Sequence, residues 1–163
     1  MTIAVIAGTF DPFTNGHFNL AVRAMNMFDE VYILIGNNPS KVPVFNRQIR
    51  AEHIKQSVRG LKNVKVAIAS HRMLVDDLIL LKANVLIKGI RNASDFEYEA
   101  NMEAINNELC PYIGTVYFRA RPNLAHISSS AFKEIIRLGR SGKWMVDDHI
   151  QEAYEKQYDN GEV

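Results

Sequence analysis

Five short apolar runs, spread over residues 3–119, constrain the fold more than any other feature of the sequence. Each run is nearly continuous and rich in β-branched residues; they are Ile3–Ala7, Val31–Gly36, Val64–Ala69, Val85–Ile90 and Thr115–Arg119. Such runs are too apolar for strands with one solvent-exposed face and are typical of parallel strands covered on both sides. Because helical segments alternate with them, the sequence predicts right-handed βαβ units and a doubly wound α/β sheet of about five parallel strands with helices on both faces.

The segments between these runs carry apolar residues at helical spacing. The pattern is visible in Phe18, Ala21, Met25 and Phe28, in Ala51, Ile54 and Val58, and in Ala100, Ala104 and Ile105. We therefore expect helices over residues 46–58, 74–82 and 94–109, from Ser128 to about Gly139, and over 146–156. With no repeat or linker in view, residues 1–163 are predicted to form one domain, with 146–163 as a C-terminal helix and tail.

Length, charge and cysteine content narrow the class of protein. A chain of 163 residues can bury one sizeable core but not two. A net charge of +1 argues against binding nucleic acid or membranes through bulk electrostatics. The lone Cys110 excludes an intrachain disulfide and a cysteine zinc site. No basic region precedes the first apolar run, and no window approaches the roughly 20 apolar residues of a membrane span, so we expect a cytoplasmic protein.

The turn after the first run carries the most informative polar residues. It lacks the G-x-G-x-x-G pattern, which argues against a dinucleotide-dependent dehydrogenase. Gly8 and Gly16 permit close approach of a ligand to the backbone, and Thr9 supplies a hydroxyl. The helix that follows would present free N–H groups and the positive end of its dipole, which favours a phosphate. His17 would either donate to that phosphate or merely cap the helix, and the stretch alone leaves both interpretations open.

Several motifs resemble those of a known enzyme family. Thr14-Asn15-Gly16-His17 resembles the (H/T)-x-G-H signature of the nucleotidylyltransferase superfamily, and Gly8-Thr9-Phe10-Asp11-Pro12 is similar to the form in phosphopantetheine adenylyltransferases. Further matches follow in order at Asn38–Lys41, Lys88–Arg91, Asp95–Glu99 and Ile127–Ser130. The resemblance covers Ile3 to about Gly139 and implies a Rossmann-like fold. It also implies transfer of an adenylyl group from ATP to 4′-phosphopantetheine, giving dephospho-coenzyme A and pyrophosphate.

The resemblance assigns roles to single residues. His17 would stabilise the transition state, Thr9 would contact both substrates, and Lys41, Lys88 and Arg91 would join His17 as catalytic residues. Besides Thr9 and His17, the ATP side would include Phe10, Gly89, Ile90, Arg91, Glu99, Ile127, Ser128, Ser129 and Ser130. Besides Thr9, the acceptor side would include Lys41, Leu74, Lys88, Asn106 and Glu134.

Lys88 also stands out on its own, because it interrupts a run that otherwise reads as buried. An unpaired buried charge is costly, so an anionic partner is expected, either a substrate or a structural carboxylate. The position at the end of a strand favours the substrate. For Ser128–Ser130, capping of a helix and binding of an anion are compatible.

The implied reaction requires the protein mainly to position the two substrates and to stabilise their charges. A phosphate with a second pKa near 6 is largely ionised at neutral pH, so neither a general base nor a protein nucleophile is required. Mg²⁺ should accompany ATP and be held mainly by phosphate oxygens and water, because no tight carboxylate cluster is present. The adjacent pairs Asp76-Asp77 and Asp147-Asp148 are better explained as surface charge. The resemblance further implies hexamers and feedback by coenzyme A, neither of which is visible in the residues themselves.

Some positions depart from the family pattern. Lys88 stands where arginine is usual, which keeps the charge but loses the bidentate geometry. Ala7 replaces a common proline, Asn46–Arg50 replaces an acidic run, and His71–Met73 differs from the usual approach to the pantetheine pocket. Two alternatives therefore stay open: a related nucleotidylyltransferase with another phosphorylated acceptor, and a non-catalytic nucleotide-binding protein. A flavodoxin-like or receiver module would need a hydroxyl loop or an acidic cluster after the first strand, and neither is present.

Overall fold

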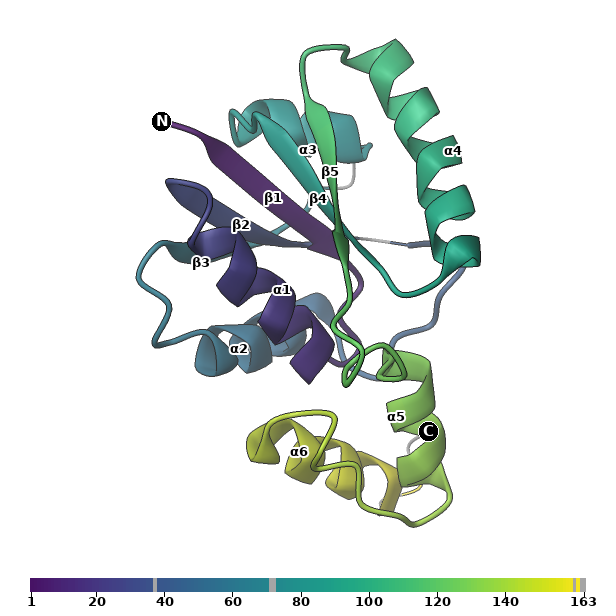
Figure 1. Cartoon of the computed structure of the whole chain (residues 1–163). Helices are drawn as coiled ribbons and strands as arrows, with labels where there is room; N and C mark the ends of the chain where they lie inside the picture. Colours follow the sequence, from purple (N-terminus) through teal and green to yellow (C-terminus); the bar gives the residue numbers. More distant parts are fainter. Residues whose placement is uncertain (37, 71–72, 160, 162–163) are drawn as a thin grey trace.

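The computed structural model describes residues 1–36, 38–70, 73–159 and 161. Within them the chain forms one five-stranded parallel sheet in the order β3-β2-β1-β4-β5 (Figure 1). The strands are β1 (Ile3–Gly8), β2 (Glu30–Ile35), β3 (Val64–Ile68), β4 (Val85–Ile90) and β5 (Gly114–Arg119). This confirms the predicted doubly wound α/β fold, and each strand begins and ends within one residue of its apolar run.

The first strand occupies the centre of the sheet. β1 pairs with β2 along its whole length, from Ile3 opposite Glu30 to Gly8 opposite Ile35, and pairs with β4 on its other edge. The chain thus leaves β1 toward β2 and later crosses to the opposite side at β4. Because ligands of open parallel sheets bind where the strand order reverses, the carboxyl ends of β1 and β4 are the place to look for a site.

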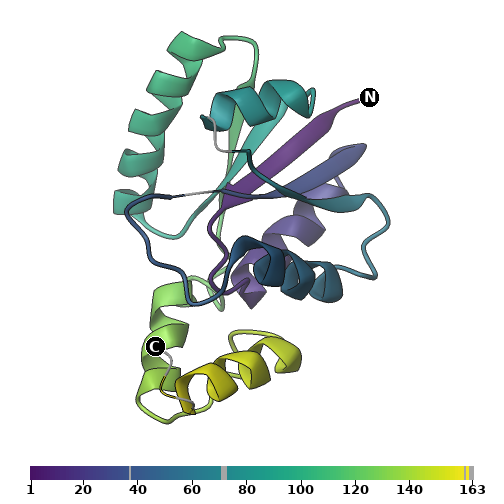
Figure 2. The same cartoon turned by 180° about the vertical axis from the view of Figure 1, so that it is seen from behind.

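Both faces of the central strands are buried. Alternate residues of β1 enter different apolar clusters, with Ala4 and Ile6 in one and Val5 in the other. Helices α1 (Asn15–Met25) and α2 (Arg47–Ser57) cover the first face, and α3 (Leu74–Leu80) covers the second (Figures 1 and 2).

The edges of the sheet and helix α4 are more exposed than the sequence predicted. In β3 the side chains of Lys65 and Ile68 are exposed, because an edge strand is only partly covered. Helix α4 (Ala93–Leu109) forms as expected, yet none of its residues, all of which the structure describes, is buried. Ala104 and Ile105 are exposed since α4 runs alongside β4 and β5 rather than over the sheet centre (Figure 1). The helical spacing predicted the helix correctly but not a buried face.

Two further helices lie beyond the carboxyl edge of the sheet: α5 (Ser129–Arg137) and α6 (Asp148–Asp159) (Figure 1). Helix α6 begins two residues later and ends three residues later than predicted. Ser128 caps α5, since its Oγ accepts a hydrogen bond from the N–H of Ala131 at 3.0 Å. In the part of the chain that the structure describes, no helix is long and apolar enough to cross a membrane.

Candidate active site

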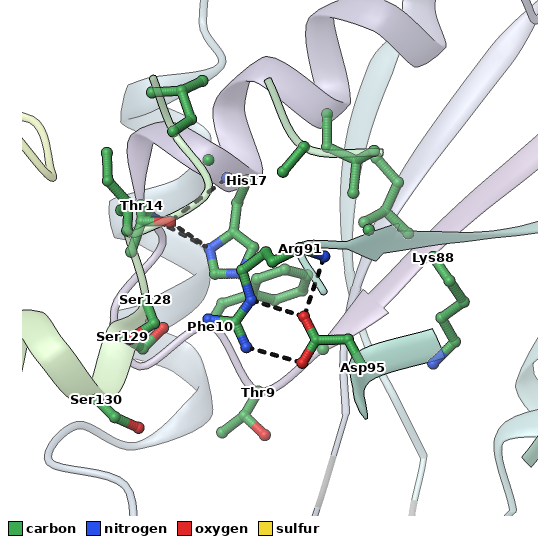
Figure 3. Close-up of a pocket in the computed structure, with 18 of the residues that line it drawn as sticks. Thr9, Phe10, Thr14, His17, Lys88, Arg91, Asp95, Ser128, Ser129 and Ser130 are labelled. Atoms are coloured by element: carbon green, nitrogen blue, oxygen red, sulfur yellow. Dashed lines mark hydrogen bonds and ion pairs between the residues drawn. The ribbon is translucent and has the colours of Figure 1, made fainter. Parts of the chain in front are cut away.

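A cavity of about 730 Å³ opens at the carboxyl ends of β1 and β4. It brings together most of the residues that the sequence singled out, although they come from five separate segments. These are Thr9, Phe10, His17, Lys41, Lys88, Gly89, Arg91, Glu99, Ile127, Ser128, Ser129 and Ser130. Figure 3 shows many of them converging on one space.

Four predicted site residues do not line this cavity. Leu74 begins α3 and packs against the apolar cluster on the other face of the sheet, and Asn106 borders a separate, much smaller cavity. Glu134 forms an exposed ion pair along α5, and Ile90 is the half-buried last residue of β4. Their roles stay predictions. Of the unusual segment before Leu74, His71 and Arg72 lie outside the described residues.

The turn after β1 is shaped by Phe10. This residue adopts the left-handed backbone conformation, with φ of 52°, which is uncommon outside glycine. Its ring folds back toward Gly8, where an added Cβ would lie 3.0 Å from the ring carbons. Glycine at position 8 therefore leaves the room that the aromatic ring requires, and the turn places Thr9 in the lining of the cavity.

His17 both caps a helix and faces the cavity. Thr14 is the N-cap of α1, and its backbone N–H donates to Nδ1 of His17 at 3.0 Å (Figure 3). The Thr14 Oγ1 lies 3.1 Å from the same nitrogen. Since an N–H donor requires a lone pair on Nδ1, the proton of the neutral ring resides on Nε2. Among the residues that the structure describes, Nε2 has no hydrogen-bond partner.

The surroundings of His17 keep its ring neutral. Phe10 and Phe13 enclose it, with ring centroids at 5.1 and 5.6 Å. Burial, followed by the charges of Arg91 and Lys41, lowers the pKa of His17 to about 4. At neutral pH this side chain is therefore an uncharged hydrogen-bond donor rather than an imidazolium. The capping interpretation is confirmed, and donation to a phosphate stays a prediction.

Two cavity cations are paired with carboxylates of α4. Lys88 Nζ lies 2.9 Å from Glu99 Oε2, and Arg91 Nε lies 2.8 Å from Asp95 Oδ2. Asp95 also accepts from Nη2 and from the backbone N–H of Arg91. This pairing raises the pKa of Arg91 and lowers the pKa of Asp95. Because Asp95 and Glu99 are one helical turn apart, α4 presents both carboxylates on one face.

Lys88 thus has the structural carboxylate that the sequence had left as one of two alternatives. Its side chain and that of Glu99 are 17% and 21% exposed, so the pair is largely withdrawn from solvent but still lines the cavity. An incoming anion would meet a lysine that already has a partner. Lys41, by contrast, has no side-chain partner among the described residues.

The sequence reasoning missed Asp11 and Lys133. Asp11 is only 3% exposed, and Lys133 Nζ donates to its Oδ2 at 2.9 Å; both residues line the cavity. Asp11 belongs to the quoted motif at the end of β1 but received no role. Lys133 follows Ser129 by one helical turn, so its spacing from the serines was a usable signal.

The serine segment at the start of α5 is fastened to the loop after β1. Ser129 Oγ donates to the carbonyl oxygen of Pro12 at 2.8 Å, while Ser128 provides the cap. Capping and cavity lining thus coincide.

One residue of the pair Asp76-Asp77 differs from the prediction: Asp77 is buried and accepts a hydrogen bond from the N–H of Ser70 at 3.0 Å. The surface-charge interpretation is wrong for Asp77, because α3 turns it inward as a cap for the preceding loop.

Cations outnumber carboxylates in the cavity lining. The basic residues are Arg23, Lys41, Lys88, Arg91, Arg121 and Lys133, against Asp11, Asp95 and Glu99. The N-terminal ends of α1 and α5 also open toward this space, as the lining residues Gly16 and Ser130 show. Such a cavity is suited to ligands that carry several phosphate groups.

Comparisons with known proteins agree with this geometry. Residues 5–135 match the family model described as cytidylyltransferase-like. The phosphopantetheine adenylyltransferase of Levilactobacillus brevis is 39% identical over 153 residues, which is 94% of each chain. The enzyme of the same name from Streptococcus equi subsp. zooepidemicus is 39% identical over 158 residues, covering 97% of this chain and 95% of that protein.

A solved structure shares the fold at lower identity. A putative nicotinate-nucleotide adenylyltransferase from Vibrio parahaemolyticus superposes with a TM-score of 0.68 over 95% of this chain and 96% of its own, at 15% sequence identity. That likeness concerns the architecture alone. The 39% identity to the two enzymes above extends over nearly the full length of the chain and shows the family. This chain belongs to the phosphopantetheine adenylyltransferases, within the cytidylyltransferase-like proteins.

Proposed function

We propose that this protein transfers the adenylyl group of ATP to 4′-phosphopantetheine and releases pyrophosphate and dephospho-coenzyme A. The observation that carries the proposal is the 39% identity to phosphopantetheine adenylyltransferases over 94% of the chain. The cavity supports it, because its excess of basic side chains suits two phosphate-bearing substrates.

The reaction is a single in-line displacement. A phosphate oxygen of the acceptor forms a bond to the α-phosphorus of ATP, and the bond from that phosphorus to the oxygen bridging to the β-phosphate breaks. The electron pair of the broken bond leaves with pyrophosphate. Since the attacking phosphate has a second pKa near 6, it is already an anion at neutral pH and needs no protein base. The protein's work is to align two polyanions and to stabilise charge at the α-phosphate.

In this proposal His17 donates from Nε2 to an α-phosphate oxygen. The ring is well prepared for it, because the N–H of Thr14 occupies Nδ1 and so leaves the proton on Nε2, while the lowered pKa keeps the ring uncharged. A donor fixed before the substrate arrives stabilises developing charge without having to reorganise. Thr9, the first residue of the loop between β1 and α1, contacts both substrates.

The remaining cations divide between the two substrates. Lys41 and Lys88 hold the phosphate of the acceptor, and Arg91 holds phosphates of ATP. Phe10, Gly89, Ile90, Glu99, Ile127, Ser128, Ser129 and Ser130 complete the ATP side, and Leu74, Asn106 and Glu134 the acceptor side. Since Lys88 and Arg91 are paired with carboxylates of α4, each phosphate would share its cation with that carboxylate or displace it.

The side chains that the structure describes do not gather into a metal site of their own. Within the described residues no three His, Cys, Asp or Glu side chains converge as metal ligands. Each carboxylate of the cavity is already paired with a cation. We therefore propose that Mg²⁺ enters with ATP, ligated by phosphate oxygens and water.

The proposal extends to assembly and regulation. We propose a homo-oligomer, of six copies by resemblance to the family, that is subject to feedback by coenzyme A. The side chains of Tyr98, Ile105 and Leu109 lie along one face of α4 and are exposed apolar groups that a neighbouring copy would cover. Light scattering on the purified protein measures the number of copies, and a monomer at micromolar concentration would contradict the assembly.

The decisive experiment is an assay with Mg²⁺, ATP and 4′-phosphopantetheine in which both pyrophosphate and dephospho-coenzyme A are quantified. Equal amounts of the two products, and their loss in His17→Ala, are the expected result. CTP in place of ATP tests the donor, and nicotinate mononucleotide in place of 4′-phosphopantetheine tests the acceptor. Turnover only with another acceptor would replace the proposed substrate, and nucleotide binding without turnover would leave a binding protein.

A further inference from the structure

Helix α6 reaches the loop after β1 through one buried contact. The hydroxyl of Tyr154 donates to Asp11 Oδ1 at 2.6 Å, and neither residue is more than 3% exposed. Burial and the neighbouring carboxylate raise the pKa of Tyr154, so its hydroxyl keeps the proton that it donates. Asp11 stands two residues after Thr9 and lines the cavity.

Asp11 gathers donors from three other parts of the chain. Its Oδ2 accepts from Lys133 Nζ on α5 at 2.9 Å, and both of its oxygens lie 3.1 Å from the backbone N of Val44. The segment before α2 that carries Lys41 and Val44 is therefore fixed by the same carboxylate. With Tyr154 included, α5, α6 and this segment all meet at Asp11.

A second contact joins the same two regions a few residues further on. The backbone N–H of Asn15 donates to the carbonyl oxygen of Met145 at 2.7 Å, and Asn15 Nδ2 donates to the carbonyl oxygen of Trp144 at 3.0 Å. Asn15 begins α1, two residues before His17. The segment 142–154 thus contacts the loop on both sides of the turn that leads into α1.

This segment is itself rigidly packed. The ring of Tyr154 meets Phe45 and Phe132 edge to face, with centroids 4.8 and 5.4 Å away. The fully buried Gln151 accepts from the backbone N–H of Gly142 at 3.0 Å, which closes the turn between α5 and α6. A segment held in this way can impose its position on the loop rather than follow it.

We propose that residues 142–154 clamp the loop between β1 and α1 in its catalytic arrangement, and that Tyr154 is a positioning residue which acts through Asp11. The inference rests on the proposed function, because it concerns how Thr9 and His17 are held for adenylyl transfer. Tyr154 touches no substrate. Tyr154 instead keeps Thr9 and His17, which contact the substrates, in alignment. Loss of its hydroxyl therefore lowers kcat more than it lowers the affinity for ATP.

Tyr154→Phe is the sharpest test, because it keeps the packed ring and removes only the hydroxyl. We expect kcat to fall about tenfold, the equivalent of one hydrogen bond to a charged group, with KM for ATP changed by less than threefold. The matched control is Tyr158→Phe: this hydroxyl, one turn further along α6, is buried and has no hydrogen-bond partner within the described residues. Kinetics are measured at 20 °C, with circular dichroism showing that both variants are folded.

A double-mutant cycle with Asp11→Ala, which removes both acceptor oxygens, separates action through Asp11 from a general loss of structure. If Tyr154 acts through Asp11, Tyr154→Phe lowers kcat by less than twofold in the Asp11→Ala background. Equal kcat for Tyr154→Phe and Tyr158→Phe, or full additivity in the cycle, overturns the proposal even if Tyr154→Phe melts at a lower temperature. Should Tyr154→Phe fail to fold, Asn15→Ala tests the second contact against Asn26→Ala, an exposed asparagine that donates to a carbonyl at the other end of α1.

Hydrogen exchange gives a readout that does not depend on turnover. In the full-length protein without substrates, Tyr154→Phe should raise the exchange rate of backbone amides in residues 9–14 several-fold more than Tyr158→Phe does. If the unaltered protein shows no adenylyl transfer, the proposed function is wrong. The hydrogen-exchange measurement still tests whether residues 142–154 fix the loop. Identical exchange in the two variants would overturn it.

Discussion

The backbone N–H of Thr14 donates to Nδ1 of His17 across 3.0 Å, so the residue that caps α1 also decides which nitrogen of the histidine carries the proton. A cap that merely starts a helix would work equally well with glutamate or glutamine at the third position. Histidine adds a second ring nitrogen that faces the cavity. One side chain thereby serves local structure and, in the proposed reaction, the transition state.

Replacing His17 tests this arrangement directly. His17→Ala removes the Nε2 donor, and kcat should fall about 10²- to 10³-fold, as when one donor to a transition-state oxyanion is lost. His17→Gln can place an amide N–H near the position of Nε2 and should recover part of that loss. Steady-state kinetics on both variants check the order. Equal activity of unaltered protein and His17→Ala would remove His17 from the mechanism.

Stability should depend on pH through the same ring. The folded pKa of about 4 lies below the ordinary 6.5, so between these values the unfolded chain binds a proton that the folded chain does not. Above pH 6.5 the neutral His17 does not lower the free energy of unfolding. As the pH drops from 6.5 toward 4, protonation of this residue in the unfolded chain lowers the free energy of unfolding by about 2–3 kcal/mol. Urea unfolding at several pH values measures the slope. His17→Gln should show a shallower slope over this range, and parallel curves would contradict the assignment.

Lys88 offers a test of the residue that departs from the family. Lys88→Arg restores a bidentate donor, and KM for 4′-phosphopantetheine should fall three- to tenfold with kcat nearly unchanged, by an estimate of roughly one added charged hydrogen bond. Lys88→Met leaves Glu99 without its cation, so KM should rise at least about tenfold and stability should fall by about 1–3 kcal/mol.

The control for Lys88 is Lys55→Met, which breaks a comparably short but exposed ion pair, 2.7 Å from Nζ to Glu52 Oε1. Exposed pairs contribute little, so neither kinetics nor stability should change measurably. If Lys88→Met behaves like Lys55→Met, the acceptor phosphate does not rely on this position.

Packing between α5 and α6 predicts a stability effect at a glycine. A Cβ on Gly142 would lie 2.7 Å from Cδ2 of Phe132, a fully buried ring that cannot swing away. Gly142→Ala should cost about 1–3 kcal/mol and lower Tm by about 3–10 °C. Gly60→Ala has no heavy atom within 4 Å of the new Cβ and serves as the control in thermal melts. Matching Tm values would show that the interface adapts.

Much of the fold could be predicted from the sequence because it depends on residues that are close together in the chain. The apolar runs predicted the strands, and the caps at Asn46, Asn92 and Ser128 explain why the predicted helix starts are nearly right. Burial was less predictable: apolar spacing at Ala104 and Ile105 predicts a helix face, while the position of α4 beside the sheet leaves that face exposed.

The site was predictable where residues follow the ends of strands or sit in motifs, as His17 and Lys41 do. It was not predictable where partners are distant. Nothing in the sequence pairs Lys88 with Glu99, or marks Asp77 as an inward cap, because both depend on how α3 and α4 are placed against the sheet. The contact of Asp11 with Tyr154 had no local signal at all.

That contact joins positions 143 residues apart in sequence. During synthesis the loop holding Asp11 leaves the ribosome early, whereas Tyr154 follows only after all five strands. Contacts between such distant positions form slowly, since a long stretch of chain must be ordered first. If the clamp acts as proposed, a nascent chain that already has its sheet still lacks the fixed loop, and its full catalytic rate is reached only once α6 has been translated and has folded.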